Sequence, residues 1–381
     1  NAATQCGFCT PGFIMSLTAH SLAPEKSSPE RVISAISGNI CRCTGYISIE
    51  HAAEDISFVL QRKDGKDPLG WLIKEAFLPE YFRGIAGRLK QLKVENQGSE
   101  TGKIVGGGTD LFVQQADAMA VADLCFLKED MTQADAYAID TIEVDTDNGI
   151  CRIGGTVTAS DILHKVELQQ YFPRLKEYFK LISSEPVRNM GTVAGNIVNA
   201  SPIADLVIFF LALDAEVHLK AKGGTTRNVP LRKFYTGYKQ LIMKPDETIL
   251  HISFRLPQQT FFNFEKVSKR QYLDIASVNS AMLLQLDDDT IKEVHLSAGG
   301  VFASPFYAEE TVSFLKGKTL TPELIKDAAT VLTSEVAPIS DIRGSKEYKS
   351  LLLHQLFFAH FSEMFPKQFT PDVLFSKIMA S

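Results

Sequence analysis

Four of the six cysteines in this chain lie in two close pairs, Cys6-x-x-Cys9 and Cys41-x-Cys43, and residues 10–40 separate the pairs. Proteins of reducing compartments rarely keep disulfides, so cysteines paired in this way more often bind a metal. A helical hairpin between the pairs would bring them together and present four thiolates. Four thiolates are the ligand set of a structural zinc ion or of a 2Fe-2S cluster, and the pattern predicts one of these two centres.

The second cysteine pair favours iron and sulfur over zinc. A single residue between two cysteines is an unusual spacing for a zinc knuckle. Gly7, Gly38 and Gly45 flank the cysteines, and they leave backbone N–H groups free to approach cluster sulfurs. When the cysteines are considered alone, the alternative interpretation is an interaction domain that is stabilised by zinc.

The length and composition indicate a folded chain of several domains. Its 381 residues exceed the roughly 100 to 200 residues of one domain, and 45% hydrophobic with 22% charged residues is a globular balance. The net charge of -6 argues against nucleic acid or an anionic membrane as a partner. No apolar run approaches the roughly 20 residues that cross a bilayer. We therefore expect a cytoplasmic protein without a nucleic-acid or membrane partner.

Changes of pattern along the chain predict an α+β protein. Ser28 followed by Pro29 is a helix-start signal inside a first region with helical periodicity. A polar, charged run with Gly and Pro follows and is typical of a linker, and short helices then mix with β-branched runs. The predicted parts are a small all-helical domain over residues 1–64, a linker over 65–76, an α+β domain over 77–257 and an α+β C-terminal lobe over 258–381.

Several elements are predicted within the later parts. β-Branched and alternating runs predict strands, and longer apolar periodicity predicts helices. The predicted strands cover residues 103–105, 249–254, 274–286 and 291–297, and the predicted helices cover residues 322–332 and 345–364.

Two glycine-rich loops are candidates for binding phosphates. The first, Gly106-Gly107-Gly108-Thr109-Asp110, follows a short strand and would expose successive backbone N–H groups to an anion. It contains neither a Walker motif nor a Rossmann fingerprint, so binding must follow another mode. Read alone, such a glycine run is more often a simple turn.

The second loop runs from Asn189 to Asn196 and continues to Ser201-Pro202 and Asp205. It pairs glycines with amide, hydroxyl and carboxylate groups, which suit phosphates and a polyol chain. The alternative is a strand-turn-helix connection in which Asp205 is a helix cap. Two such loops in one domain favour binding of a dinucleotide.

These motifs resemble the molybdenum hydroxylases of the xanthine dehydrogenase family. The stretches Gln5–Phe13 and Gly38–Tyr46 resemble the helical 2Fe-2S domain of that family. The resemblance implies that the four cysteines of the two pairs bind a 2Fe-2S cluster and that Gln5 contacts the molybdopterin cofactor. It covers essentially the whole chain, with the C-terminal lobe matching more loosely.

The glycine-rich loops resemble the FAD domain of the same family, which has the vanillyl-alcohol-oxidase type of fold. The resemblance implies that Asp205 meets the ribityl side of FAD, and that Ile249 and Lys266 lie near the isoalloxazine. An ammonium group there would stabilise the anionic reduced flavin. The other implied FAD-binding residues are Gly106, Gly107, Gly108, Thr109, Asp110, Thr192, Ala194, Gly195, Asn196 and Ser201.

The resemblance implies an oxidoreductase subunit for electron transfer. Electrons would pass from a molybdenum cofactor in a partner subunit, through 2Fe-2S, to FAD and on to NAD+ or another acceptor. The chain starts at Asn1 rather than at Met, so we expect it to be a fragment. The resemblance implies that the ferredoxin-like 2Fe-2S domain, which precedes this region in the family, is missing from it. It should be inactive on purines without its molybdenum subunit. The alternative is a non-catalytic FAD-binding module or a zinc-stabilised interaction module.

Overall fold

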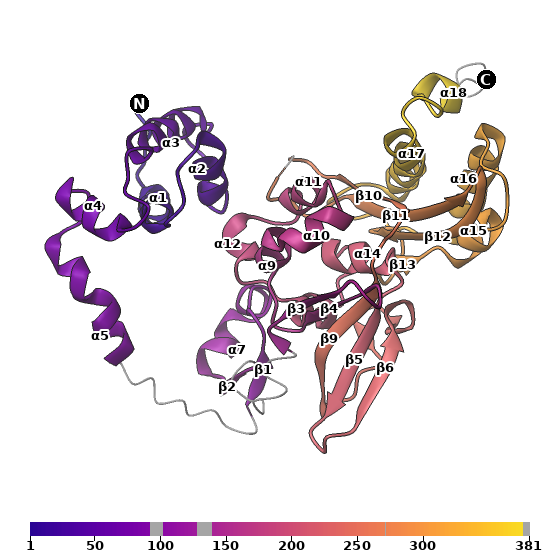
Figure 1. The fold of residues 1–381 in the computed structure, drawn as a ribbon, viewed down its shortest axis with the longest axis horizontal. Helices are drawn as coiled ribbons and strands as arrows, with labels where there is room; N and C mark the ends of the chain where they lie inside the picture. The colour runs from indigo at the N-terminus through magenta and orange to yellow at the C-terminus, as the bar shows by residue number, and fades with distance from the viewer. Residues whose placement is uncertain (92–101, 128–138, 271, 376–381) are drawn as a thin grey trace. The chain divides into compact units, whose positions relative to one another are not determined.

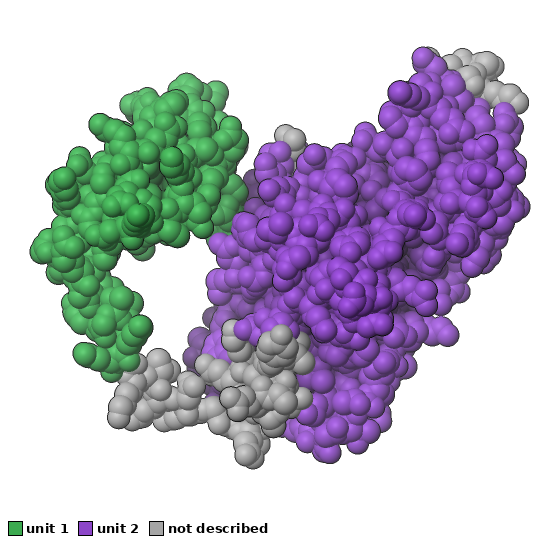
Figure 2. All heavy atoms as spheres, in the orientation of Figure 1, with its two compact units in different colours: residues 1–97, 184–187 green, residues 98–183, 188–381 purple. Residues whose placement is uncertain are grey.

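The computed structural model describes residues 1–91, 102–127, 139–270 and 272–375. The chain divides into two compact units (Figure 2). Unit 1 consists of residues 1–97 and 184–187, and unit 2 consists of residues 98–183 and 188–381. Each unit is described by itself.

Unit 1 is built from helices over its described residues 1–91, as the periodicity predicted. Ser28 caps α2 because its hydroxyl accepts a hydrogen bond from the Arg31 amide at 3.4 Å, and Pro29 follows at the first helical position. A small core forms around Val32, which is fully buried. The helices are α1 (Thr10–Leu22), α2 (Pro29–Ile36), α3 (Ile47–Leu60), α4 (Pro68–Lys74), the 3-10 helix η1 (Glu80–Gly84) and α5 (Ile85–Gln91).

The stretch that we predicted as a linker, residues 65–76, contains the helix α4. Asp67 caps this helix by accepting a hydrogen bond from the Gly70 amide at 2.9 Å, and Leu72 is buried. The predicted domain boundaries otherwise remain predictions.

Unit 2 contains a five-stranded antiparallel sheet in the order β3-β4-β9-β5-β6 and a four-stranded antiparallel sheet in the order β10-β11-β12-β13. Two smaller sheets pair β1 with β2 and β7 with β8. The strands are β1 (Lys103–Val105), β2 (Leu124–Phe126), β3 (Ile142–Asp145), β4 (Ile150–Gly154), β5 (Glu216–Ala221), β6 (Thr226–Pro230), β7 (Tyr235–Gly237), β8 (Gln240–Leu241), β9 (Glu247–Arg255), β10 (Phe261–Val267), β11 (Val278–Asp287), β12 (Thr290–Gly299) and β13 (Phe306–Tyr307).

Helices lie between and after these strands in the chain, as Figure 1 shows. They include a run of short helices between β4 and β5 and longer helices after β13. The helices are α6 (Leu111–Gln114), α7 (Ala116–Val121), α9 (Ala159–His164), α10 (Val166–Tyr171), α11 (Leu175–Lys180), α13 (Val193–Val198), α14 (Asp205–Leu211), the 3-10 helix η2 (Leu231–Lys233), α15 (Glu309–Leu315), α16 (Pro322–Glu335), α17 (Lys346–Met364) and α18 (Pro371–Phe375). The short helix α12 (Glu185–Arg188) falls mostly within the residues of unit 1.

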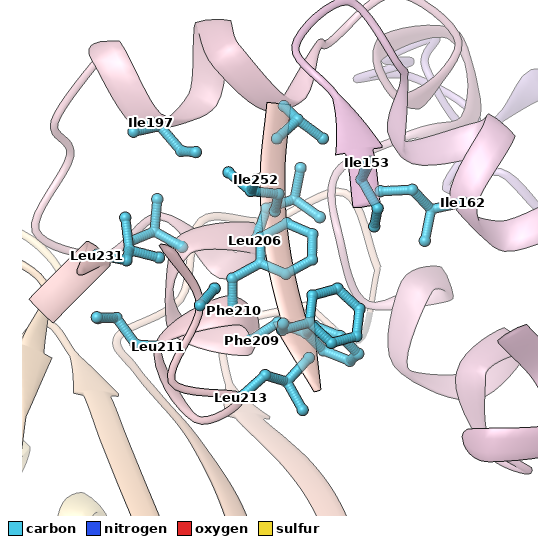
Figure 3. Packing of buried hydrophobic residues seen from close by; sticks show 14 of the residues in the cluster. Ile153, Ile162, Ile197, Leu206, Phe209, Phe210, Leu211, Leu213, Leu231 and Ile252 are labelled. Atoms are coloured by element: carbon cyan, nitrogen blue, oxygen red, sulfur yellow. The ribbon is translucent and has the colours of Figure 1, made fainter. Parts of the chain in front are cut away.

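Helix α14 lies at the centre of the main core of unit 2. Every residue from Leu206 to Leu211 is buried, as expected for a helix that is apolar on all sides. Phe209 and Phe210 pack with residues of β9 such as Ile252 (Figure 3). The burial of this helix fixes the position of Asp205, its first residue.

A second hydrophobic core lies within the C-terminal lobe. Helices α15 and α17 pack against β12 and β11, and α16 packs on those two helices. The core contains fully buried Phe357 and Phe361. The α+β fold class predicted from the sequence is confirmed.

Candidate cofactor-binding sites

The four cysteines of the two motifs come together in unit 1 as two pairs of thiols. The sulfurs of Cys6 and Cys43 lie 3.4 Å apart, and Cys9 and Cys41 share a hydrogen bond between their thiols. Each pair therefore joins one cysteine from each motif. Helix α1 begins directly after Cys9 and places the first motif at its N-terminus.

The second motif is held by a turn that leads into α3. The Cys41 amide donates a hydrogen bond to the Tyr46 hydroxyl at 3.1 Å, and the Thr44 hydroxyl donates to the Cys41 sulfur at 3.1 Å. Tyr46 has a φ of 72° and starts the helix. This backbone bend explains why a short Cys-x-Cys motif is followed by a glycine, Gly45, whose φ is also positive.

Hydrogen bonds and burial shift the pKa values of the four thiols in different directions. Donation from the Thr44 hydroxyl and amide lowers the pKa of Cys41 to about 7, and a hydrogen bond from the Phe8 backbone lowers the pKa of Cys6. Loss of hydration raises the pKa of Cys9, and the hydrogen bond with Cys6 raises that of Cys43. One thiol in each pair is thus the more readily ionised, as metal binding requires.

The pairing of the thiols fits a centre with two metal ions. In a 2Fe-2S cluster each iron takes two protein thiolates, and the arrangement supplies two thiols at each of two positions. Within residues 1–91, 102–127, 139–270 and 272–375, no three His, Cys, Asp or Glu side chains form a group that could hold one metal ion. Gln5 is exposed next to the first thiol.

The two glycine-rich loops of unit 2 are in direct contact. A Cβ atom on Gly107 would overlap the carbonyl oxygen of Met190, and a Cβ on Gly106 would lie 2.5 Å from the Thr192 hydroxyl. Gly108 has a φ of +70°, a conformation that favours glycine. The absence of side chains thus lets two segments distant in sequence pack backbone against backbone.

The second loop starts the helix α13. Thr192 caps this helix, and its hydroxyl accepts a hydrogen bond from the Gly195 amide at 3.1 Å. The side-chain oxygen of Asn196 is buried and has no hydrogen-bond partner among the described residues. Such an orphaned acceptor is costly, and it is the kind of atom that a bound polar group would satisfy.

The loop is anchored to the five-stranded sheet through Gly155. The Ala194 amide donates to the Gly155 carbonyl at 2.8 Å, and a Cβ on Gly155 would lie 2.5 Å from the carbonyl oxygen of Ile249. The side chain of Ile249 is only 2% exposed and belongs to the main core. Gly155 was not singled out from the sequence, because an isolated glycine after a strand reads as a turn.

Asp205 and Lys266, predicted at different parts of the flavin, form an ion pair. Lys266 Nζ lies 2.7 Å from Asp205 Oδ2 and also donates to the Leu181 carbonyl at 2.7 Å. The Lys266 side chain is 1% exposed and that of Asp205 is 13% exposed. Burial raises the pKa of Asp205, while the ion pair with Lys266 opposes that rise.

Asn279, which sequence reasoning missed, holds the other oxygen of Asp205. Its Nδ2 donates to Asp205 Oδ1 at 2.5 Å. The available signal was an amide inside the apolar strand β11, where a buried polar residue needs a partner.

Thr109, Asp110 and Ser201 are the remaining predicted residues, and the hydrogen-bond partners of the last two lie within four residues of them in the sequence. Thr109 is half-buried, and Asp110 is exposed and accepts a hydrogen bond from Gln114 at 3.2 Å. The Ser201 hydroxyl accepts from the Ile203 amide at 3.5 Å. A cavity of 840 Å³ elsewhere in unit 2 is lined by residues such as Arg255 and Lys292 and by none of the predicted FAD-binding residues.

Comparison with known families matches three successive segments of the chain. Residues 1–54 match a [2Fe-2S] binding domain, residues 86–258 match the FAD binding domain in molybdopterin dehydrogenase, and residues 264–364 match the CO dehydrogenase flavoprotein C-terminal domain. The first match lies within unit 1, the second contains both glycine-rich loops, and the third lies in the C-terminal lobe.

Individual relatives agree with the family models. The chain is 30% identical to the glyceraldehyde dehydrogenase medium chain of Sulfolobus acidocaldarius over 57% of this chain and 76% of that protein. It is 25% identical to xanthine dehydrogenase 1 of Arabidopsis thaliana over 94% of this chain but only 32% of that protein. The chain therefore spans about a third of the length of that relative.

Solved structures share the fold. A carbon monoxide dehydrogenase chain from Hydrogenophaga pseudoflava superposes with a TM-score of 0.61 at 24% identity, over 68% of this chain and 88% of that chain. Quinoline 2-oxidoreductase from Pseudomonas putida 86 gives a TM-score of 0.60 at 21% identity, over 68% and 88%.

The fold and the two sites define a flavin and iron-sulfur protein, with a 2Fe-2S domain at its N-terminus followed by an FAD-binding domain. The chain belongs to the molybdenum hydroxylase family, as its motifs implied. In the described part of the chain, no helix has the length and apolar character to span a membrane.

Proposed function

We propose that the chain passes electrons from a molybdenum cofactor in a partner subunit, through its 2Fe-2S cluster, to FAD and on to NAD+ or another acceptor. Membership of the molybdenum hydroxylase family supports this proposal, as does the presence of both cofactor domains in one chain. The proposed activity is that of a cytoplasmic oxidoreductase subunit which does not act on purines without its molybdenum subunit. The proposed partners are that subunit and a ferredoxin-like 2Fe-2S domain.

The observation that carries the proposal is the contact between the two glycine-rich loops. Gly107 and Met190 meet through their backbones, so the glycine-rich first loop, which could expose N–H groups to a pyrophosphate, lies against the start of the second loop. The orphaned oxygen of Asn196 lies on the second loop. We propose that residues 106–110 and 192–196 hold the pyrophosphate of FAD.

The residues next to these loops have proposed positions along FAD. Asp205 would meet the ribityl side, with Ser201 beside it, while Ile249 and Lys266 would lie toward the isoalloxazine. Lys266 is paired with Asp205 at 2.7 Å, so its charge would act on the flavin as part of this pair. When bound, FAD supplies the exchange between one-electron and two-electron transfer.

The thiols of unit 1 have a proposed role as cluster ligands. Cys6 with Cys43 and Cys9 with Cys41 would each hold one iron, because each pair is preformed. Donors from Thr44 to the Cys41 sulfur would favour its thiolate. The exposed Gln5 is proposed to contact the molybdopterin of the partner subunit.

Cofactor reconstitution tests the proposal. The chain would be incubated anaerobically with iron, sulfide and FAD, desalted, and measured for its visible spectrum, iron, acid-labile sulfide and flavin. We expect flavin and iron-sulfur absorption together. A colourless protein that retains zinc would favour the interaction module, and flavin that NADH does not reduce would favour a different acceptor or a non-catalytic FAD module. A featureless spectrum would reject the proposal.

A further inference from the structure

The carboxylate of Asp205 is held by two donors that approach its two oxygens. Lys266 Nζ from β10 lies 2.7 Å from Oδ2, and Asn279 Nδ2 from β11 lies 2.5 Å from Oδ1. The same Asn279 nitrogen also lies 3.3 Å from the Ile203 carbonyl, in the segment just before Asp205. The amide thus fixes both the carboxylate and the backbone that leads to it.

Asn279 is buried, so its amide needs hydrogen-bond partners within the protein. Its side chain is fully buried in β11, where an amide destabilises the fold unless it is hydrogen-bonded. Its oxygen has no hydrogen-bond partner among the described residues. The hydrogen bonds of this buried amide are therefore made by its nitrogen, to Asp205 and to the Ile203 carbonyl.

Gly299 makes room for this arrangement. It lies directly opposite Asn279 in the pairing of β11 with β12, and a Cβ on residue 299 would overlap the Asn279 oxygen. The sequence around Gly299 reads as a simple turn. In the structure, the missing side chain lets the amide point its nitrogen at Asp205.

We infer that Asn279 is a positioning residue that holds the Asp205 carboxylate ionised and in one orientation toward the ribityl side of the dinucleotide. This inference rests on the proposed FAD site, but Asn279 itself acts through Asp205. Asn279 lies outside the cysteine motifs and the glycine-rich loops of the sequence.

The amide of Asn279 is one of the groups that favour the ionised form of the buried Asp205 carboxyl. Burial favours the neutral form of Asp205, and the groups that oppose this are the Lys266 charge and the donors of Lys266 and Asn279. Among the residues that the structure describes, Lys266 is the charged side chain that forms an ion pair with this carboxyl. Loss of the amide donor should therefore let Asp205 bind a proton at higher pH.

The first test uses the protein without cofactor. Infrared difference spectra would follow the protonated carboxyl of Asp205 across a pH series in the wild type, Asn279→Leu and the double variant Asn279→Leu with Asp205→Asn. We expect a carboxyl band in Asn279→Leu at a pH where the wild type has none, and its loss in the double variant. A new band that persists in the double variant, or no new band, would overturn the inference.

Asn263 is a buried amide of the same sheet that donates to a different carboxyl, so Asn263→Leu should give a band of Glu265 that remains when Asp205→Asn is added. It is 1% exposed and bonds Glu265 and His360 rather than Asp205. Gly299→Ala is a second variant that displaces the amide without removing it. It should act in the same direction as Asn279→Leu and remains informative if that variant does not fold.

The second test separates positioning from general loss of structure by comparing FAD with ADP, which lacks the ribityl and flavin parts. We expect Asn279→Leu to weaken FAD binding about tenfold to a hundredfold, as for loss of a hydrogen bond to a charged group, and to leave ADP binding unchanged. Equal weakening of both ligands would overturn the inference. If the wild type binds neither ligand, the proposed FAD site fails, whereas the infrared test still decides whether Asn279 controls Asp205.

Discussion

Gly107 lies against the carbonyl oxygen of Met190 so closely that a Cβ on residue 107 would overlap that oxygen. The contact joins two loops that are far apart in the sequence, and it depends on the absence of a side chain. The proposed pyrophosphate site is therefore sensitive to the smallest possible substitution at this position.

Gly107→Ala should force the two loops apart and weaken FAD binding by at least about tenfold, since a backbone carbonyl cannot move aside as a flexible side chain can. The measurement is FAD affinity by fluorescence titration. Gly223→Ala is the control, because a Cβ there meets nothing within 4 Å. Unchanged FAD affinity in Gly107→Ala would argue against the proposed site.

Cys9→Ser should lose most of the reconstituted iron and acid-labile sulfide, because serine does not replace a thiolate ligand of an iron-sulfur cluster. Iron and sulfide per chain are the quantities to measure after anaerobic reconstitution. Cys151→Ala serves as the control, since Cys151 is a buried core residue of β4 in unit 2. Equal iron content in the two variants would contradict the assignment of the cysteines.

Phe209→Ala should lower the free energy of unfolding by about 3 to 5 kcal/mol, the usual effect of removing a large buried aromatic ring. Phe209 is 1% exposed, and its ring centroid lies 4.7 Å from that of Phe262 and 5.4 Å from that of Phe172. Urea unfolding measures the effect. The exposed Val166→Ala is the control, and a loss of similar size there would show that the α14 core is not the source.

Acid should destabilise unit 2 through His360. This residue is fully buried between Asn263 and Ser280, and burial lowers its pKa to about 3. In the unfolded state the histidine has its ordinary pKa near 6.5, so as the pH falls the unfolded state binds the proton before the folded state does. The free energy of unfolding therefore keeps its full contribution from His360 above about pH 6.5. It decreases between about pH 6.5 and pH 3 by up to about 1.4 kcal/mol per pH unit.

The check is the free energy of unfolding between pH 7 and pH 4 in the wild type and in His360→Gln. The variant should have a flatter pH dependence, although its stability at pH 7 is lower because buried packing changes. His164→Asn, at an exposed position, should keep the wild-type slope. A wild-type slope in His360→Gln would assign the acid sensitivity to other groups.

Local signals in the sequence identified many elements correctly. Ser28 with Pro29 marks the start of α2, and the helix predicted over residues 345–364 is α17, because capping and apolar periodicity act within a few residues. The strand predicted over residues 274–286 begins only at Val278 in the structure. Asp274 instead accepts a hydrogen bond from the Arg270 amide at 3.1 Å. Such a bond between a side chain and the backbone competes with a strand, and an alternating pattern of apolar residues does not reveal it.

By itself, the sequence determined the kind of chemistry: four cysteines in two motifs, two glycine-rich loops, and the family to which they belong. Only the tertiary structure decided which residues meet. It paired Cys6 with Cys43, brought Lys266 to Asp205 across 61 positions, and added Asn279 across 74. Motif spacing indicates residue types and local conformation. The contacts of Asp205 instead follow from the burial of α14 against β11 and β12, a result of packing over the whole unit.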